Sequence, residues 1–377
     1  MATECRSARF VSDSGVRVER LDVSAFSVPT DVPESDGTAE WESTTIVVVE
    51  VAGGGRTGLG WTYGNSASAT VIDSTLRAVV IDHDAMRVMA AWQRMVAACR
   101  NLGRRGVASM AIAAVDTALW DLKARILDLP LATLLDAIRD SVPVYGSGGF
   151  CSYSDTRLAD QLTGWVDQGI ARVKMKVGRD PSRDLYRVAV AREAIGQDTE
   201  LFVDANGALS RAQALDVARR YAEDYDVRWF EEPVSSDDLE GLRLLVDRSP
   251  AGMDIAAGEY GYTPDYFERM LAAGAVTSCL QADVTRCEGI TGFSRVAALC
   301  NARSLELSAH CGPAIHAHVC CAVPSLRHLE YFHDHVRLER LLFDGVLEPD
   351  HGELRPDLTR PGNGLEFKRA DAEHYAI

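Results

Sequence analysis

From residue 142 onward, short apolar runs alternate with amphipathic segments at a regular spacing. The runs begin about 20 to 30 residues apart, which is the period of a βα unit in a parallel barrel. Between them, segments such as 210–225 and 264–273 carry apolar residues at helical spacing. Eight runs occur, at residues 142–148, 172–178, 201–207, 227–233, 254–260, 278–285, 305–311 and 326–332. The pattern predicts an eight-stranded parallel barrel with a short last connection.

The N-terminal part of the chain has a different pattern. Residues 16–28, 44–51 and 57–63 predict three strands, and the Pro-, Asp-, Ser- and Gly-rich residues 29–42 are interpreted as a loop. Apolar residues at helical spacing then predict three helices, at about 68–79, 84–102 and 109–127. Strands followed by helices indicate an α+β unit.

These patterns divide the chain into four parts. We predict a loose tail at 1–15, an α+β domain at 16–140, the barrel at 141–337 and a C-terminal segment at 338–377. The C-terminal segment contains no further βα unit, and we expect it to return to the N-terminal domain. A chain of 377 residues has the length expected for two such domains.

The composition limits which binding partners and which cellular compartment we expect for this protein. The net charge of −16 argues against nucleic acid and anionic membranes as partners. No apolar stretch reaches the roughly 18 residues of a membrane span, and the N-terminal residues lack the apolar core of a secretory signal. The nine cysteines are odd in number and irregularly spaced, which indicates reduced thiols and a cytoplasmic protein.

Six successive strands of the predicted barrel end in polar residues. In parallel barrels, catalytic groups lie at these C-terminal strand ends. Lys174 and Lys176 are two positions apart, so they share one face of a strand. Two crowded ammonium groups lower each other's pKa toward the range of a useful base. The alternative interpretation is a pair of solvated lysines at a strand end.

Asp204, Glu231 and Glu259 end three consecutive strands and are 27 and 28 positions apart. Three carboxylates at one barrel mouth repel each other unless a cation lies among them. Oxygen ligands without histidine or cysteine favour Mg²⁺, with Mn²⁺ as an alternative. The competing interpretation is three unrelated surface acids.

Asp283 and His310 fall at the ends of the next two strands. A carboxylate bonded to one imidazole nitrogen sets the tautomer and raises the basicity of the other nitrogen, which makes a general acid or base. A lone histidine beside a cysteine, here Cys311, is more often structural, but the pairing with Asp283 favours chemistry.

In this order, the Lys-x-Lys motif, the three acids and the Asp–His pair resemble the mandelate racemase branch of the enolase superfamily. The similarity extends over nearly the whole chain from about Val16, and residues 118–123 look like part of a helix of the family's capping domain. The resemblance implies an α/β fold, a modified TIM barrel of (β/α)7β type with an N-terminal α+β capping domain. It also implies a homo-oligomer that acts on a small carboxylate.

The resemblance assigns a role to each strand-end residue. The metal ligands would be Asp204, Glu231 and Glu259. Lys176 would be the base on one face of the substrate, and Lys174 would contact the substrate carboxylate and lower the pKa of Lys176.

On the other face, Asp283 would orient His310. Glu330, on the eighth strand, would hydrogen-bond the substrate carboxylate in its protonated form, and Asn206 would contact the substrate. Arg286 stands where the lactonising branch tends to have a lysine, which argues against that branch.

The chemistry implied is removal of a proton α to a carboxylate, with the charge stabilised by the cation. Loss of a β-hydroxyl then makes a dehydratase of acid sugars, the favoured hypothesis. Reprotonation on the opposite face makes a racemase or epimerase of 2-hydroxy acids, the alternative. A catalytically silent binding protein is a third possibility, against which the complete acid/base and ligand set argues.

Two further motifs suggest other chemistry. Residues 53–58 fit the dinucleotide fingerprint G-x-G-x-x-G, but a strand pattern follows where that motif needs a helix, so we predict a hairpin turn instead of an NAD site. The histidines and cysteines between 310 and 321 fit no structural zinc spacing. Substrate choice is expected to depend on residues 29–41 and 61–66, with Trp41 and Tyr63 as candidate lid residues.

Overall fold

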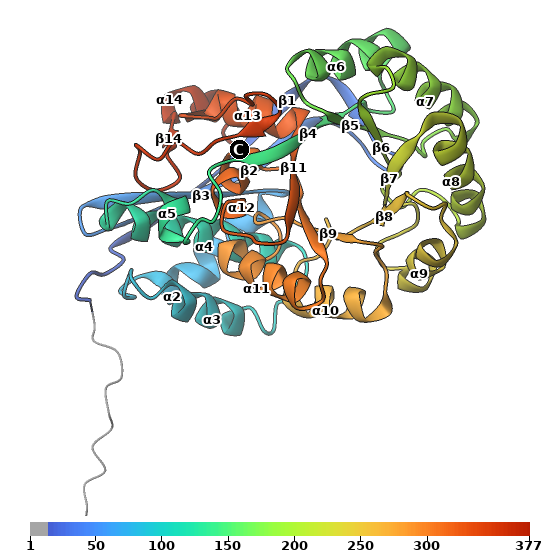
Figure 1. Ribbon diagram of the computed structural model, residues 1–377. Coiled ribbons are helices and arrows are strands. Elements are labelled where there is room, and N and C mark those ends of the chain that lie inside the picture. The colour runs from blue at the N-terminus through green and yellow to red at the C-terminus, as the bar shows by residue number, and fades with distance from the viewer. Residues whose placement is uncertain (1–13) are drawn as a thin grey trace, which may run out of the picture.

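The computed structural model describes residues 14–377, and most of the predicted tail at 1–15 lies outside the described residues. Eight parallel strands form a ring in the order β8, β7, β6, β5, β4, β11, β10, β9 (Figure 1). Their bounds are β4 Val142–Gly148, β5 Arg172–Lys176, β6 Glu200–Asp204, β7 Val227–Glu231, β8 Asp254–Ala256, β9 Cys279–Ala282, β10 Glu306–Ala309 and β11 Leu326–Phe332. Backbone hydrogen bonds from Thr277 to Ile255 and from Gln281 to Ala257, both 3.0 Å, close the ring between β8 and β9.

Seven helices connect these strands and cover the outside of the ring (Figure 1). They are α6 Asp155–Asp167, α7 Pro181–Ile195, α8 Arg211–Tyr225, α9 Leu239–Arg248, α10 Pro264–Ala273, α11 Gly289–Ala302 and α12 Pro313–Cys320. The short last connection is therefore a helix, α12, and α13 His333–Leu342 follows β11. The predicted (β/α)7β barrel is confirmed.

Large side chains fill the interior of the barrel. Phe202 and Trp229, two positions before Asp204 and Glu231, are buried and stack with their ring centroids 5.4 Å apart. Residues two apart on a strand point to the same face, so Asp204 and Glu231 also point inward, above this aromatic layer. The acids therefore lie at the open mouth of a packed barrel.

The N-terminal sheet consists of three antiparallel strands, β1 Arg20–Ser35, β2 Glu40–Gly53 and β3 Arg56–Tyr63. The prediction of a loop at 29–42 was wrong, because β1 and β2 form one long hairpin whose turn spans only residues 36–39. Strand β1 is an edge strand, and its pairing is interrupted between Pro29 and Glu34. An edge strand with such an irregularity tolerates prolines, which have no N–H to donate.

Helices pack on one face of this sheet and form a second apolar core. They are α1 Ala67–Val71, η1 Ile72–Leu76, α2 Arg77–Val80, α3 Val88–Ala98 and α4 Val107–Ile126. The short helix α5 Leu131–Leu134 instead packs into the core that contains the barrel. Helix α4 packs most closely on β3, where the backbone of Ala114 and Ala118 leaves no room for a side chain at Gly60. The strand from Arg56 follows the turn after Gly53 directly, so the hairpin predicted at 53–58 is present.

The C-terminal segment runs back along both parts of the molecule. It contains β12 Phe343–Asp344, β13 Glu353–Leu354, β14 Glu366–Phe367, α14 Arg369–Ala372 and η2 Glu373–Tyr375. Its backbone bonds to the N-terminal domain, with Asn363 N donating to Asp121 Oδ1 at 2.6 Å and Ile377 N to Ala25 O at 3.0 Å. The predicted boundaries at 140 and 337 stay predictions. Among residues 14–377, no helix combines the length and apolarity needed to cross a membrane.

Candidate active site

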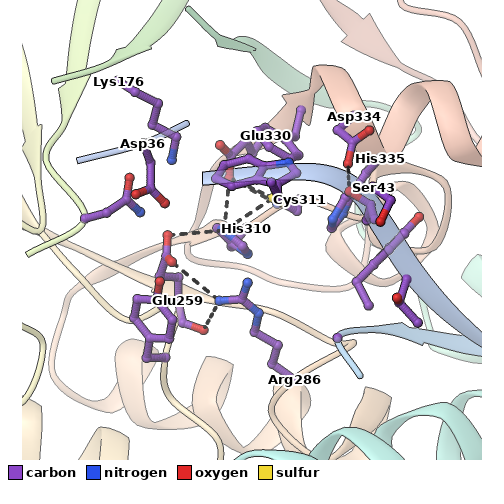
Figure 2. Close-up of a pocket in the computed structure, with 18 residues that line it drawn as sticks. Asp36, Ser43, Lys176, Glu259, Arg286, His310, Cys311, Glu330, Asp334 and His335 are labelled. Atoms are coloured by element: carbon purple, nitrogen blue, oxygen red, sulfur yellow. Dashed lines mark hydrogen bonds and ion pairs between the residues drawn. The ribbon is translucent and has the colours of Figure 1, made fainter. Parts of the chain in front are cut away.

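A cavity of about 310 Å³ opens at the C-terminal ends of the barrel strands, beneath the β1–β2 hairpin (Figure 2). The hairpin reaches the barrel through its turn, where Gly37 packs against the backbone of Val177 and Ala205. All nine residues that the sequence predicts for the site are buried at this mouth: Lys174, Lys176, Asp204, Asn206, Glu231, Glu259, Asp283, His310 and Glu330.

Asp204, Glu231 and Glu259 offer carboxylate oxygens that all lie within 4.8 Å of one another. Asp204 and Glu231 end the neighbouring strands β6 and β7 in direct register, and Glu259 follows β8. Burial and the repulsion of Asp204 raise the pKa of Glu231. The Oε2 atom of Glu259 is buried, and its charged neighbour is His310 Nε2 at 3.3 Å. A cation among the three acids would relieve the repulsion and use this oxygen, so the residues fit a metal ion bound by oxygen.

The two lysines are buried, which contradicts the interpretation as solvated side chains. Lys174 Nζ lies 2.8 Å from both oxygens of Glu231 and 2.8 Å from Glu330 Oε1, while Lys176 Nζ lies 2.5 Å from Asp204 Oδ2. Burial and Lys174 lower the pKa of Lys176, as predicted, but Asp204 raises it more. The predicted net lowering was therefore wrong, because an ion pair with Asp204 outweighs the neighbouring ammonium group.

The imidazole of His310 is held by Asp283, whose Oδ2 lies 2.9 Å from Nδ1. The other oxygen of Asp283 accepts hydrogen bonds from the backbone N–H and the hydroxyl of Thr285, at 2.7 and 2.8 Å. Burial raises the pKa of Asp283, but the hydrogen bond to His310 lowers it more, so this carboxyl stays ionised. The arrangement leaves Nε2 of His310 at the cavity, as a proton-transfer role requires.

Several groups surround that Nε2 atom. Burial lowers the pKa of His310, but the carboxylates of Glu259 and Glu330 raise it more. The Sγ atom of Cys311 is 3.3 Å from Nε2 and 3.5 Å from Glu330 Oε2, so these three residues are near enough to share an ion. Burial and Glu330 raise the pKa of the Cys311 thiol, which keeps it protonated when no metal ion is bound.

Glu330, on β11, accepts hydrogen bonds from Ser147 Oγ at 2.5 Å and from the Cys311 backbone at 3.2 Å. Burial raises its pKa, but Lys174 and His310 lower it more. The expectation of a protonated Glu330 was therefore wrong in this arrangement, because Lys174 stabilises the carboxylate. Asn206 lines the cavity with a buried Oδ1 atom that has no hydrogen-bond donor.

The cavity also contains residues that the motifs did not single out. Trp41 and Tyr63, expected as lid residues, do line it. Further lining residues come from the hairpin, from the segment after β9 and from the start of α13: Asp36, Ser43, Thr44, Thr45, Arg286, Asp334 and His335. The available signal was the polar run 333–335, which directly follows a buried strand and so interrupts the apolar pattern.

A parallel barrel with an N-terminal α+β domain and three buried strand-end acids defines a capped-barrel protein with a candidate metal centre. The model for the mandelate racemase / muconate lactonizing enzyme N-terminal domain matches residues 21–136, and the enolase C-terminal domain-like model matches residues 157–372. The chain therefore belongs to the mandelate racemase / muconate lactonizing enzyme family of the enolase superfamily.

Named relatives extend over nearly the whole chain. A 3,6-anhydro-alpha-L-galactonate cycloisomerase from Streptomyces coelicolor is 35% identical and aligns over 93% of this chain and 97% of its own length. An L-talarate/galactarate dehydratase from Salmonella typhimurium is 31% identical and aligns over 92% and 88%. The relatives thus include lyases and isomerases, and the chain is an enzyme of this broad kind.

Solved structures agree with the fold. A mandelate racemase/muconate lactonizing enzyme-like protein from Rubrobacter xylanophilus is 58% identical, with a TM-score of 0.94 over 96% of this chain and 100% of that one. A racemase from Streptomyces coelicolor with bound magnesium is 32% identical, with a TM-score of 0.89 over 96% and 100%.

Proposed function

We propose that the protein is a Mg²⁺-dependent hydro-lyase that converts a sugar acid to a 2-keto-3-deoxy acid. The observation that carries this proposal is the pair Lys176 and His310. Both side chains line one cavity, and they come from β5 and the end of β10, three places apart in the eight-strand ring. Two proton-transfer groups on different walls of a cavity match removal of one group and protonation of another on a single substrate.

Asp204, Glu231 and Glu259 would hold Mg²⁺, or Mn²⁺ in its place. When bound, the ion stabilises the negative charge that develops on the substrate carboxylate after the α-proton leaves. The relief of repulsion among the three acids supports this assignment.

The other roles follow from the contacts at the mouth. Lys176 or His310, according to the configuration at the α-carbon, takes the α-proton. His310 in its protonated form then donates a proton to the departing β-hydroxyl, which leaves as water, and Asp283 supports the imidazolium at Nδ1. Lys174, Glu330 and Asn206 would orient the substrate carboxylate and its neighbouring hydroxyl.

The names of the relatives support lyase chemistry, since they include the talarate/galactarate dehydratase, an arabinonate dehydratase and a D-galactonate dehydratase. The alternative is a racemase or epimerase of a 2-hydroxy acid, for which the same two opposed groups would serve. The similarity to a racemase and a cycloisomerase from Streptomyces supports this alternative. The two reactions differ in product, because only dehydration makes a keto acid.

The test is a screen of sugar acids with Mg²⁺ in which 2-keto-3-deoxy acids are detected as semicarbazones, with a chelator-treated sample as control. We expect keto acid from at least one sugar acid and none after chelation. Exchange of the α-proton in D₂O without keto acid would identify the racemase or epimerase instead. A screen with neither keto acid nor exchange would overturn both and leave a binding protein.

We also infer a cytoplasmic homo-oligomer. The eight cysteines within residues 14–377 are all free thiols, and most are buried, which supports a reducing compartment. Sedimentation equilibrium would measure the number of subunits, and a monomer at micromolar concentration would contradict the homo-oligomer.

A further inference from the structure

Among residues 14–377, the permanent cations that line the cavity gather at one end of it. They are Lys176 and Arg286, and both are paired with strand-end carboxylates. Lys176 bonds Asp204, and Arg286 lies 3.5 Å from Glu259 Oε1 and 3.8 Å from Asp283 Oδ2. These cations therefore belong to the reacting end of the site, where the substrate's own carboxylate would bind.

The opposite end is formed by hydroxyl groups and one imidazole (Figure 2). Ser43, Thr44 and Thr45 come from β2, and Tyr63 comes from β3. The ring of His335 stacks on Tyr63 at a centroid distance of 3.4 Å. Its Nδ1 atom accepts a hydrogen bond from Gly312 N at 3.2 Å, so the ring proton lies on Nε2. Burial lowers the pKa of His335 to about 3, which makes it a neutral donor.

The one charged side chain at this end, among the described residues that line the cavity, is an acid. Asp334 is buried, accepts a hydrogen bond from the Thr44 hydroxyl and lies 2.7 Å from Arg337, whose charge it neutralises. A second carboxylate on the substrate would therefore be desolvated beside Asp334 with no free cation to pair with, which is strongly unfavourable. A hydroxymethyl group would instead find both donors and acceptors.

We propose that the site accepts monocarboxylic sugar acids, the aldonates, and rejects the aldarates that carry a second carboxylate at the far end of the same chain. The proposal rests on the proposed function for the orientation of the substrate. The proposal narrows the proposed function to one class of sugar acid. The fold alone does not determine this class, since the same barrel could be lined with cations at both ends of the cavity.

Matched pairs of acids test the proposal. Gluconate and glucarate, and galactonate and galactarate, differ only in the terminal group. With Mg²⁺, we expect kcat/KM to be at least tenfold higher for the aldonate in each pair that reacts. Thermal protection by each acid is measured in parallel. If no acid is dehydrated but aldonates protect better, dehydration is wrong and the aldonate class stands. Better protection or turnover with aldarates would overturn the inference, and protection by neither class would overturn it together with the proposed function.

A charge-insertion pair adds a second, independent measurement. Ser43→Lys places a cation at the far end of the cavity. We therefore expect the ratio of kcat/KM for the aldarate to kcat/KM for the aldonate to rise at least tenfold. Ser27→Lys is the control, because Ser27 lies on the adjacent strand with its hydroxyl 3.2 Å from that of Ser43 and does not line the cavity. It should leave the ratio unchanged. Equal ratios in the two variants would count against the assignment of the far end.

Discussion

The Nε2 atom of His310 lies 3.3 Å from Oε2 of Glu259, across the mouth of the barrel. Without a metal ion, a protonated His310 therefore pairs with the same carboxylate that would bind the metal. The proton and the metal compete for Glu259, so metal affinity and the protonation of His310 must be linked.

This relationship predicts that Mg²⁺ binding releases a proton. Glu259 helps to raise the pKa of His310 above its ordinary 6.5, and a cation on Glu259 removes that contribution. The pKa of His310 then falls, so affinity for Mg²⁺ should rise with pH between the lowered and the raised pKa of His310, by up to tenfold per pH unit for one linked proton. Calorimetry in buffers of different ionisation enthalpy measures the released proton. The His310→Asn variant should release markedly less, and equal release would rule out this linkage.

Replacing Glu259 by Gln should abolish metal binding and turnover while the fold remains. A neutral amide lowers the negative charge of the cluster and takes away one anionic ligand, so Mg²⁺ affinity should fall by at least about 100-fold. Glu240→Gln, on the exposed face of α9, is the matched control and should bind Mg²⁺ normally. Calorimetric titration measures the loss of metal binding, and circular dichroism shows whether the fold remains. Full activity in Glu259→Gln would mean that the ligand assignment is wrong.

Replacing Asp283 by Asn should impair the step that uses His310. The amide can still accept the Nδ1–H hydrogen bond, but it cannot stabilise the imidazolium, so the rate should fall by about 10²- to 10⁴-fold. The limb of the pH–rate profile that belongs to His310 should move to lower pH. His310→Asn should abolish the same limb, whereas α-proton exchange by Lys176 should survive in both variants. An unchanged profile in Asp283→Asn would show that the pair does not work as a unit.

A methyl group at Gly37 should lift the hairpin from the barrel. A Cβ atom there would lie 2.8 Å from Val177 O and 2.9 Å from the Ala208 side chain, and it would also clash with Ala205 O. Because the hairpin carries one wall of the cavity, Gly37→Ala should lower kcat/KM by about 10- to 100-fold. Mg²⁺ affinity should hold, since the ligands lie on the barrel. Gly164→Ala, in α6 with no atom within 4 Å, is the control and should leave kcat/KM unchanged; equal activity of the two variants would contradict the predicted role of the hairpin turn.

The strand-end residues could be predicted from the sequence because each barrel strand is short and its side chains alternate. Asp204 and Glu231 each follow a buried aromatic residue by two positions, which sets their direction without knowledge of the fold. The hairpin could not be predicted in this way, since Pro29 and Gly37 are typical of loops and their effect depends on the edge position and the barrel contact. The pKa of Lys176 also depends on the distance to Asp204, which is a property of the folded mouth alone.

The hairpin also carries a carboxyl group whose burial makes stability depend on pH. Glu34 is fully buried, and its Oε2 atom accepts a hydrogen bond from Trp41 Nε1 at 2.9 Å. Burial, reinforced by Asp334, raises the pKa of Glu34 from 4.5 to about 8. Between these two values the unfolded chain is ionised while the folded protein keeps the proton, so stability falls as the pH rises from 4.5 and levels off above about 8.

Glu34→Gln removes this titration and keeps a carbonyl acceptor for Trp41. Relative to the parent protein, its free energy of unfolding should increase by about 4 kcal/mol between pH 5 and pH 9. Asp31→Asn is the control on the same strand: Arg157 lowers the pKa of Asp31 despite the opposing effect of burial, so its contribution titrates below 3.8. Asp31 contributes less to the raised pKa of Glu34 than burial and Asp334 do, so the cost of Asp31→Asn should differ much less between the two pH values. Urea unfolding of the three proteins measures these differences, and a pH-independent effect of Glu34→Gln would show that Glu34 is ionised in the folded protein.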